Sequence, residues 1–115
     1  MKKINIVKKN EDFKRIIVNN KPLKCELFNI YIERTNEKIH HFGISVSKKN
    51  GNAVVRNKIK RRLKSIIDKK NYQNGFNCII IVKRAITLYD YNYIENKLLE
   101  ALNKLNIIEG EPREK

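Results

Sequence analysis

The side chains of this 115-residue chain that could do chemistry are mainly cations, and they are concentrated in one stretch. Between residues 48 and 70 there are ten Lys or Arg residues against one acid, Asp68, so this window carries +9 of the formal net charge of +14. A charge run is often only a solvated helix face, but like charges at helical spacing repel one another and destabilise the helix. An imbalance this large therefore indicates a polyanionic partner, either a nucleic acid or an anionic membrane surface.

Groups that could catalyse a reaction are scarce by comparison. His40 and His41 are neighbours whose side chains would point to opposite faces of a strand, and we expect both at the surface near a turn. No glycine-rich phosphate loop, nucleophile motif or metal-ligand spacing accompanies them in the sequence. The two cysteines, Cys25 and Cys78, are too few for a disulfide framework, so we expect reduced thiols in the cytosol. The sequence predicts a binding protein with no catalytic or metal site of its own.

The elements that must position the cations alternate along the chain. Amphipathic spacing predicts three helices, at residues 10–19, 53–70 and 90–106. Alternating or continuous apolar residues predict three strands, at residues 27–34, 42–47 and 78–82. The order α-β-β-α-β-α indicates an α+β sandwich of a sheet and helices.

The second of these helices carries the basic residues. Asn52 is a natural N-cap for it. A step of 100° per residue gathers its apolar residues into one stripe: Val55, Ile59, Leu63, Ile66 and Ile67. Because we expect this stripe to cover the sheet, a charge at Val55 should unfold the domain. The same use of the apolar stripe, together with the lack of Trp anchors, disfavours a peripheral membrane protein.

Length and composition predict a single domain over residues 1–115, with residues 1–8 and 108–115 expected to be frayed. Hydrophobic residues make up 41% of the chain, which is enough to build a core. No run of about 18 apolar residues is present that could span a membrane. The N-terminal residues also lack the apolar stretch of a secretory signal, so a cytoplasmic protein is expected.

One stretch of the sequence is far more specific than a general basic helix. Residues 42–63, FGISVSKKNGNAVVRNKIKRRL, resemble the signature of the protein subunit of bacterial ribonuclease P. In that family a strand ends in Ser-Lys-Lys, and Gly-Asn-Ala-Val and then Arg-Asn-Arg-x-Lys-Arg follow on a helix. The resemblance extends over nearly the whole chain, through the helix around Phe13, the Phe28-x-x-Tyr31 strand and the strand of residues 79–84.

Two positions depart from the family pattern. Lys58 stands where the family usually has Arg, which keeps the charge but loses a bidentate fork. Ile17 lies one helical turn after Phe13, where many members carry an aromatic residue.

The resemblance implies a protein that assists a catalytic RNA. The RNA would remove the 5′ leader from precursor tRNA, with Mg²⁺ held mainly by RNA, and the chain alone is expected to be inactive. The implied partners are the catalytic RNA and precursor tRNA, with no membrane and no protein partner required. The implied fold is a two-layer α+β sandwich with a central, roughly four-stranded mixed sheet, three helices and a left-handed β-α-β crossover. Because only three strands are evident in the sequence, the implied fourth strand would be short or lie near residues 21–26 or 86–88. A structural RNA-binding protein of the ribosomal-protein type remains the alternative.

The resemblance also implies two sets of binding residues. One set on and beside the basic helix would bind the catalytic RNA: Asn52, Arg56, Asn57, Lys58, Lys60, Arg61 and Lys64. A second set would hold the single-stranded leader in a cleft between the first helix and the sheet: Phe13, Ile17, Tyr31, Lys48 and Lys49. Bases stack on apolar and aromatic side chains, and phosphates pair with lysines. Surfaces that combine the two are therefore suited to binding RNA.

Overall fold

The computed structural model describes residues 1–110, which form a four-stranded mixed sheet with three α-helices. The helices are α1 (Asn10–Asn19), α2 (Ala53–Ile67) and α3 (Tyr91–Lys104). The strands are β1 (Leu23–Lys24), β2 (Phe28–Arg34), β3 (His40–Val46) and β4 (Phe76–Val82). Three short 3₁₀ turns are η1 (Lys3–Asn5), η2 (Lys48–Asn50) and η3 (Arg84–Leu88). The predicted α+β class is confirmed.

The strand order is β1-β2-β4-β3, with β3 and β4 parallel and the other neighbours antiparallel. The chain passes from β3 to its parallel neighbour β4 through α2, so the basic helix is the crossover. The short fourth strand is β1, within residues 21–26, whereas residues 86–88 belong to the 3₁₀ turn η3.

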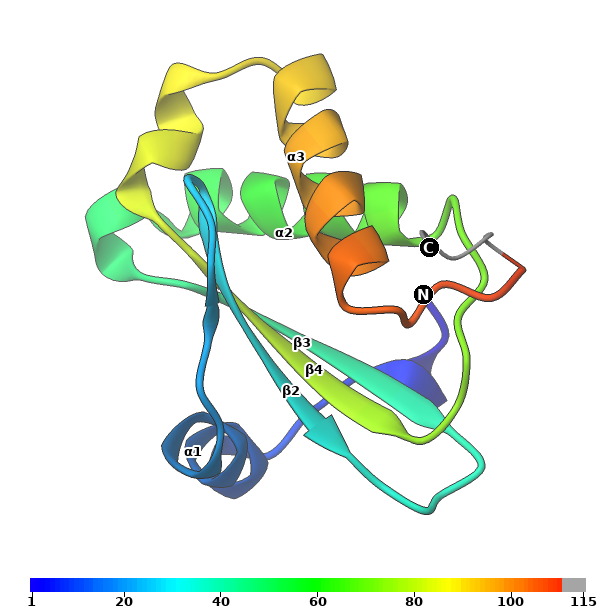
Figure 1. Cartoon of the computed structure of the whole chain (residues 1–115). Coiled ribbons are helices and arrows are strands. Elements are labelled where there is room, and N and C mark those ends of the chain that lie inside the picture. Colours follow the sequence, from blue (N-terminus) through cyan, green and yellow to red (C-terminus); the bar gives the residue numbers. More distant parts are fainter. Residues whose placement is uncertain (111–115) are drawn as a thin grey trace.

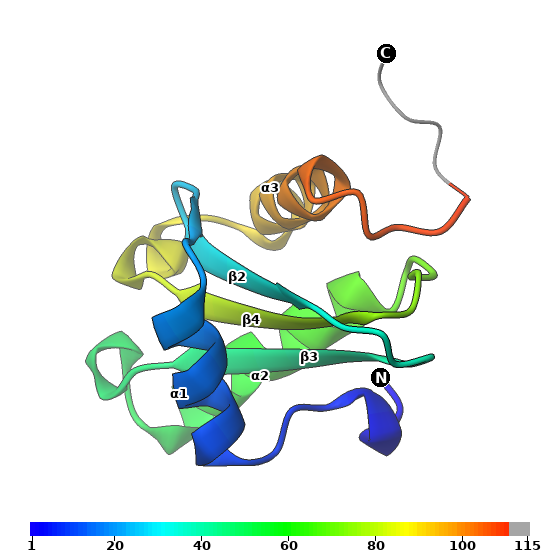
Figure 2. The ribbon, with the colours of Figure 1, turned by 60° about the horizontal axis from the view of Figure 1, so that its bottom comes forward.

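The helices lie on both faces of the sheet, as Figure 1 shows. The face with α2 and α3 holds the main core, which includes Phe28, Ile30 and Phe42 from the strands and Leu63 and Leu98 from the helices. This pair of layers is the predicted sandwich. The other face is covered in part by α1, which runs across the strands rather than along them (Figure 2). Sheet residues on that face therefore end up either beneath α1 or beside it.

Side-chain caps fix where the two long helices begin. The Asn52 side chain accepts a hydrogen bond from the Val55 N–H at 3.0 Å, and the Asp90 side chain accepts one from the Tyr93 N–H at 2.9 Å. Each cap satisfies a backbone donor that the first turn of a helix leaves without a partner. The cap at Asn52 confirms the predicted start of the basic helix.

The predicted apolar stripe of α2 is buried only in its second half. Leu63, Ile66 and Ile67 are at most 1% exposed, but Val55, in the first turn of α2, is 39% exposed. The expected burial of Val55 is therefore wrong, and a charge at this position is no longer expected to unfold the domain. The periodicity located the correct helix face, but it could not reveal how much of that face is covered.

Both ends of the described chain make contacts with the rest of the fold. Ile6 forms a β-bridge with Phe42, and the Val7 N–H donates to the Phe42 carbonyl at 2.9 Å, so the segment predicted to fray at residues 1–8 includes residues that pair with β3. Near the other end, Ile108 is buried and bridges to Tyr72. The remainder of the predicted frayed tail, residues 111–115, lies outside the described residues.

The two histidines also differ from expectation, because both lie within β3 and are half-buried. Their side chains do point to opposite faces. The His40 ring stacks on Phe76 with ring centroids 5.4 Å apart, whereas Nδ1 of His41 is hydrogen-bonded to Oδ1 of Asn77 at 2.6 Å. Both are thus structural residues of the sheet rather than surface residues near a turn.

Candidate nucleic-acid interface

A groove lies along the edge of β3. β3 is the last strand in the sheet order of the described chain, and the N-terminal segment pairs only with its first part, at Phe42. Beyond that bridge the strand borders a cavity of about 550 Å³. The cavity is lined by the N-terminal segment, by one side of α1, by Phe42 and residues 44–46 of β3, and by two lysines of α2. We call this cavity the β3 groove.

The floor of the β3 groove depends on a glycine. Phe13 of α1 lies directly over Gly43: a Cβ atom at Gly43 would be 2.6 Å from Cζ of Phe13 and 2.8 Å from Cδ1 of Ile79. Gly43 therefore allows the Phe13 ring to lie on the strand itself. Ile17, one turn further along α1, lines the same groove, so this side of the helix presents one aromatic and one aliphatic side chain to it.

The opposite wall of the groove is cationic. Lys60 and Lys64 lie one helical turn apart on α2, and both line the β3 groove together with Phe13 and Ile17. Lys14 of α1 adds a third cation. The groove thus combines apolar surface, on which a base can stack, with cations that can pair with phosphates.

The charge of the basic helix is not neutralised within the described part of the chain. Residues 56–64 form no ion pair with a carboxylate among residues 1–110. The acid of the basic window, Asp68, instead pairs with the N-terminal ammonium group of Met1. This leaves a one-sign surface, which attracts a polyanion at long range.

The other basic-helix residues predicted to bind RNA lie around the outer side of α2. Asn57, Lys58 and Arg61 are exposed, and Arg56 is half-buried. Asn52 is exposed too, but its side-chain oxygen is occupied as the N-cap. The predicted set is therefore divided by the structure, because Lys60 and Lys64 face the β3 groove whereas most of the others face solvent.

Lys48 and Lys49 stand where β3 ends. They form the 3₁₀ turn η2, both are exposed, and neither lines the groove. Since Val46 lines the groove and precedes them by only two and three residues, these lysines extend the cationic surface past the end of β3.

Tyr31 does not lie in the β3 groove. It is half-buried in β2 and pairs with Ile79 of β4, which in turn pairs with Gly43 of β3. Tyr31 is thus two strand spacings, roughly 9–10 Å, from the strand on which Phe13 lies. It shares the sheet face of the groove but is not among the residues that line it. Of Phe13, Ile17 and Tyr31, which were predicted to share a cleft between the first helix and the sheet, only the first two line the β3 groove.

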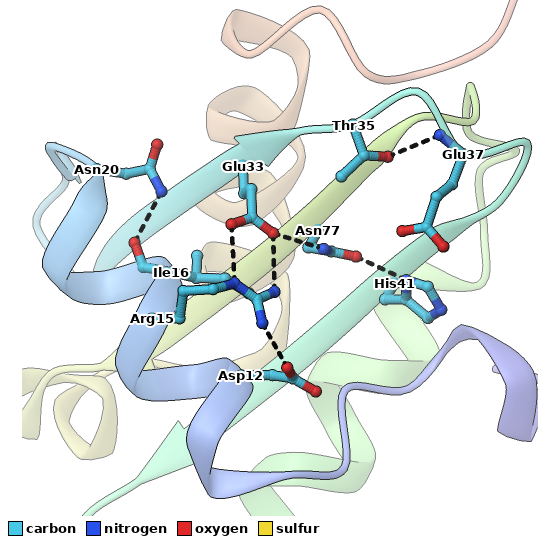
Figure 3. Close-up of polar contacts among 9 residues, drawn as sticks. All are labelled: Asp12, Arg15, Ile16, Asn20, Glu33, Thr35, Glu37, His41 and Asn77. Carbon is cyan, nitrogen blue, oxygen red and sulfur yellow. Dashed lines mark hydrogen bonds and ion pairs between the residues drawn. The ribbon is translucent and has the colours of Figure 1, made fainter.

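A polar network holds α1 on the sheet beside the groove (Figure 3). Arg15 of α1 donates to both carboxylate oxygens of Glu33 on β2, at 3.2 and 3.0 Å, and also to Asp12 at 2.6 Å. Asn77 of β4 donates to Glu33 at 2.8 Å and is bonded to His41 of β3. The network links α1 to all three long strands, so it sets how the helix lies across them.

Charge pairing within this network shifts two pKa values. The hydrogen bonds with Glu33 and then Asp12 raise the pKa of Arg15. The hydrogen bond from Arg15 lowers the pKa of Glu33, against the opposing effect of partial burial. Both groups are thus held in their charged forms, which preserves the bidentate contact.

Sequence reasoning missed several of these residues. The role of Gly43 had one available signal, a glycine inside an alternating strand, which often marks a close approach by another chain segment. The N-terminal segment and the Arg15–Glu33 pair had none, because both depend on contacts between residues far apart in the sequence.

The arrangement combines surfaces that are suited to binding. Within residues 1–110, no group of three His, Cys, Asp or Glu side chains is placed to hold a metal ion. The same residues include no helix that is both long and apolar enough to cross a membrane. What the surface provides is a groove with apolar and cationic walls, next to a helix with unpaired cations.

Fold and site together define a small basic α+β protein whose exposed crossover helix and edge groove suit a polyanion. The family model described as Ribonuclease P matches residues 1–106, and the chain belongs to this family.

Individual relatives agree over nearly the full length. The chain is 35% identical over 109 residues to the ribonuclease P protein component of Streptococcus agalactiae, with 94% of this chain and 100% of that protein covered. It is 37% identical to the corresponding protein of Streptococcus gordonii, with 100% and 98% covered. Among solved structures, it is similar to a Staphylococcus aureus RNase P protein mutant described as having defective mRNA degradation activity. The TM-score is 0.81 at 33% identity, with 91% of each chain covered.

Membership of this family fixes the general role of the chain. It is the protein subunit of an endoribonuclease that processes tRNA, and it works in a holoenzyme with an RNA partner. The findings support this role rather than that of a ribosomal structural protein.

Proposed function

We propose that the chain binds the catalytic RNA of ribonuclease P through the outer side of α2 and holds the 5′ leader of precursor tRNA in the β3 groove. The RNA performs the hydrolysis. The Mg²⁺ that the reaction needs is held mainly by RNA, since the described residues offer no cluster of metal ligands. We also propose that the holoenzyme acts in the cytoplasm and requires no further protein partner.

The observation that carries this proposal is the pairing of Phe13 and Ile17 with Lys60 and Lys64 in one groove. A single-stranded leader has unstacked bases and a charged backbone, and it needs both kinds of surface along one track. Stacking on Phe13 requires no particular base, which suits a leader whose sequence differs from one tRNA to the next. Lys60 and Lys64 pair with leader phosphates in this arrangement, in addition to the RNA-binding role first expected of them.

The remaining residues keep separate roles. Arg56, Asn57, Lys58 and Arg61 contact phosphates of the folded catalytic RNA, for which exposed cations on a convex helix are suited. We keep Tyr31 as a candidate leader contact that lies outside the β3 groove.

The test measures binding of reconstituted holoenzyme to precursor tRNA with a leader of several nucleotides and to mature tRNA. Phe13→Ala should weaken binding to the precursor about 5- to 150-fold, the value of one stacked base, and leave binding to mature tRNA nearly unchanged. Tyr31→Ala, measured in parallel, tests whether the leader extends past the groove. Assembly with the catalytic RNA and a circular dichroism melt confirm that each variant is folded.

A matched pair of charge variants tests the lysine wall. The slope of log affinity against log salt concentration for precursor binding should become about 0.7 units less negative in Lys60→Ala. That is the contribution of one phosphate contact on a single strand. Lys38→Ala removes the same charge from an exposed turn between β2 and β3 and should have little effect. Equal losses of mature and precursor tRNA binding in Phe13→Ala and Lys60→Ala would refute the assignment of the leader to this groove.

A further inference from the structure

A second cavity lies on the other side of the basic helix. It has a volume of about 260 Å³ and is enclosed by α2, η3 and α3. Its apolar lining includes Ile59, Ile86 and Ile94, and Lys58 and Arg62 belong to its walls. Lys60, which faces the β3 groove, and Arg62 project about 160° apart around the helix axis. The two cavities are therefore separate, and we call the second one the α2–α3 pocket.

One wall of the α2–α3 pocket is an aromatic ring that is already fixed in place. Tyr89 lines the pocket, and its ring is stacked on Tyr93 with centroids 4.3 Å apart and an interplanar angle of 13°. Both phenol groups donate hydrogen bonds to the carboxylate of Glu26, and Lys97 lies over the Tyr93 ring at 5.4 Å. The Tyr89 ring is thus held in position before any ligand arrives, which lowers the entropic cost of stacking on it.

The charges around the pocket favour an anionic ligand. Lys58 and Arg62 are exposed, lie one helical turn apart, and have no carboxylate partner among the described residues. Two carboxylates on neighbouring elements keep their charges: Glu26 accepts hydrogen bonds from the two phenols, and Asp90 caps α3. The pocket therefore has an apolar interior, and Lys58 and Arg62 form a cationic rim on its α2 side.

Exposed apolar side chains occur in and beside the lining segments. Val55 lines the pocket and is 39% exposed. Leu88 does not line the pocket, but it lies between the lining residues Thr87 and Tyr89 in the sequence and is 78% exposed. Apolar surface left open beside cations is the combination with which proteins bind unstacked bases of RNA.

We propose that the α2–α3 pocket takes one unstacked base of a single-stranded RNA segment, and that Lys58 and Arg62 bind the phosphates on either side of that base. Lys58, which is also proposed to contact the catalytic RNA, would therefore border both surfaces. The base packs against Tyr89 and extends the Tyr93–Tyr89 stack. A second copy of the chain is a poorer occupant, because it would bring two bodies of charge +14 together. This site is independent of leader binding, since it lies on the opposite side of α2 from the β3 groove.

The test uses the full chain with labelled methyl groups, followed by nuclear magnetic resonance. It is titrated with octaadenylate and, separately, with an octamer of the same ribose-phosphate backbone that lacks the bases. Octaadenylate should shift the methyl signals of Ile59 and Ile86, whereas the base-free octamer should leave Ile86 unchanged. The methyl signals of Ile17 and Ile44 report on the β3 groove in the same samples.

Two variants and a matched control sharpen the assignment. Val55→Trp fills the mouth of the pocket and should weaken binding, read at Ile86, by about 5-fold or more. Val18→Trp makes the same change at a valine of α1 that is 79% exposed and does not line the pocket, and it should have no effect at Ile86. Arg62→Ala, a truncation of an exposed side chain, provides a second disruption should the tryptophan disturb the fold.

Three results would overturn the proposal. Octaadenylate could shift only Ile17 and Ile44, which would place bases in the β3 groove alone. Equal shifts of Ile86 by both octamers would show that the site binds phosphate without a base. Shifts of Val55 and Leu88 that grow with protein concentration in the absence of RNA would identify a second copy of the chain as the occupant. The decisive signal, that of Ile86, belongs to the α2–α3 pocket alone, so it is read separately from binding in the β3 groove.

Discussion

Gly43→Ala provides a sharp test of how the β3 groove is built. The added Cβ would lie 2.6 Å from Cζ of Phe13 and 2.8 Å from Cδ1 of Ile79, both well inside van der Waals contact. Since both atoms are at the ends of side chains, the backbone can stay in place while the Phe13 ring moves away from the strand. We expect a stability loss near the low end of the range for overpacking, about 1 kcal/mol. For a domain of this size that corresponds to a decrease of roughly 4 °C in Tm.

The functional loss should be specific to substrates that carry a leader. A Phe13 ring displaced from the strand no longer offers its stacking position, so holoenzyme affinity for a precursor with a long leader should fall about 5-fold or more. Binding to mature tRNA and assembly with the catalytic RNA should change little. The assay is titration of both substrates at one salt and Mg²⁺ concentration.

A double-mutant cycle isolates the contact itself. Phe13→Ala removes the ring that the new Cβ would strike, so adding Gly43→Ala to it should cost less stability than it does in the wild-type chain. We expect a coupling of about 0.5–1 kcal/mol between the two positions in denaturant unfolding. Strict additivity, together with unchanged leader affinity in Gly43→Ala, would refute the argument that Gly43 positions Phe13.

Three further outcomes follow from the described contacts. The hydrogen bond from Arg15 lowers the pKa of Glu33 in the folded state. The pair therefore contributes stability above the ordinary carboxyl pKa of 4.5, and this contribution is lost as the pH falls through the lowered pKa. The free energy of unfolding, measured from pH 6 to 3, should fall less steeply in Glu33→Gln than in the wild-type chain. Val55→Asp should remain folded in a thermal melt, because Val55 is 39% exposed and an acid in the first helical turn is favourable. Leu63→Ala, at a fully buried position, should lower the free energy of unfolding by about 2–5 kcal/mol. Unfolding of Val55→Asp would contradict the observed exposure of Val55. Burial raises the pKa of the Cys78 thiol, so a thiol reagent should label the half-buried Cys25 first and reach Cys78 only at the rate of unfolding, which mass spectrometry can follow.

The sequence by itself determined the local features of this protein. Helix starts followed from side chains that cap their own helix, as at Asn52, and strand faces followed from alternation, as at Phe28 and Ile30. The concentration of positive charge on α2 is likewise a property of consecutive residues. The family resemblance rested on the same kind of information, an uninterrupted motif across residues 42–63, and the family is confirmed.

Only the tertiary structure decided which of these features meet. The order β1-β2-β4-β3 inserts β4 between Tyr31 and the strand under Phe13, and the oblique path of α1 places Phe13 over Gly43. The packing of α2 against the rest of the fold leaves Val55 exposed and places Lys60 in the wall of the groove. Periodicity along a helix or strand fixes only the direction of a side chain relative to its own element. Which element lies opposite depends on strand order and crossing angles, which arise from packing between residues distant in the sequence.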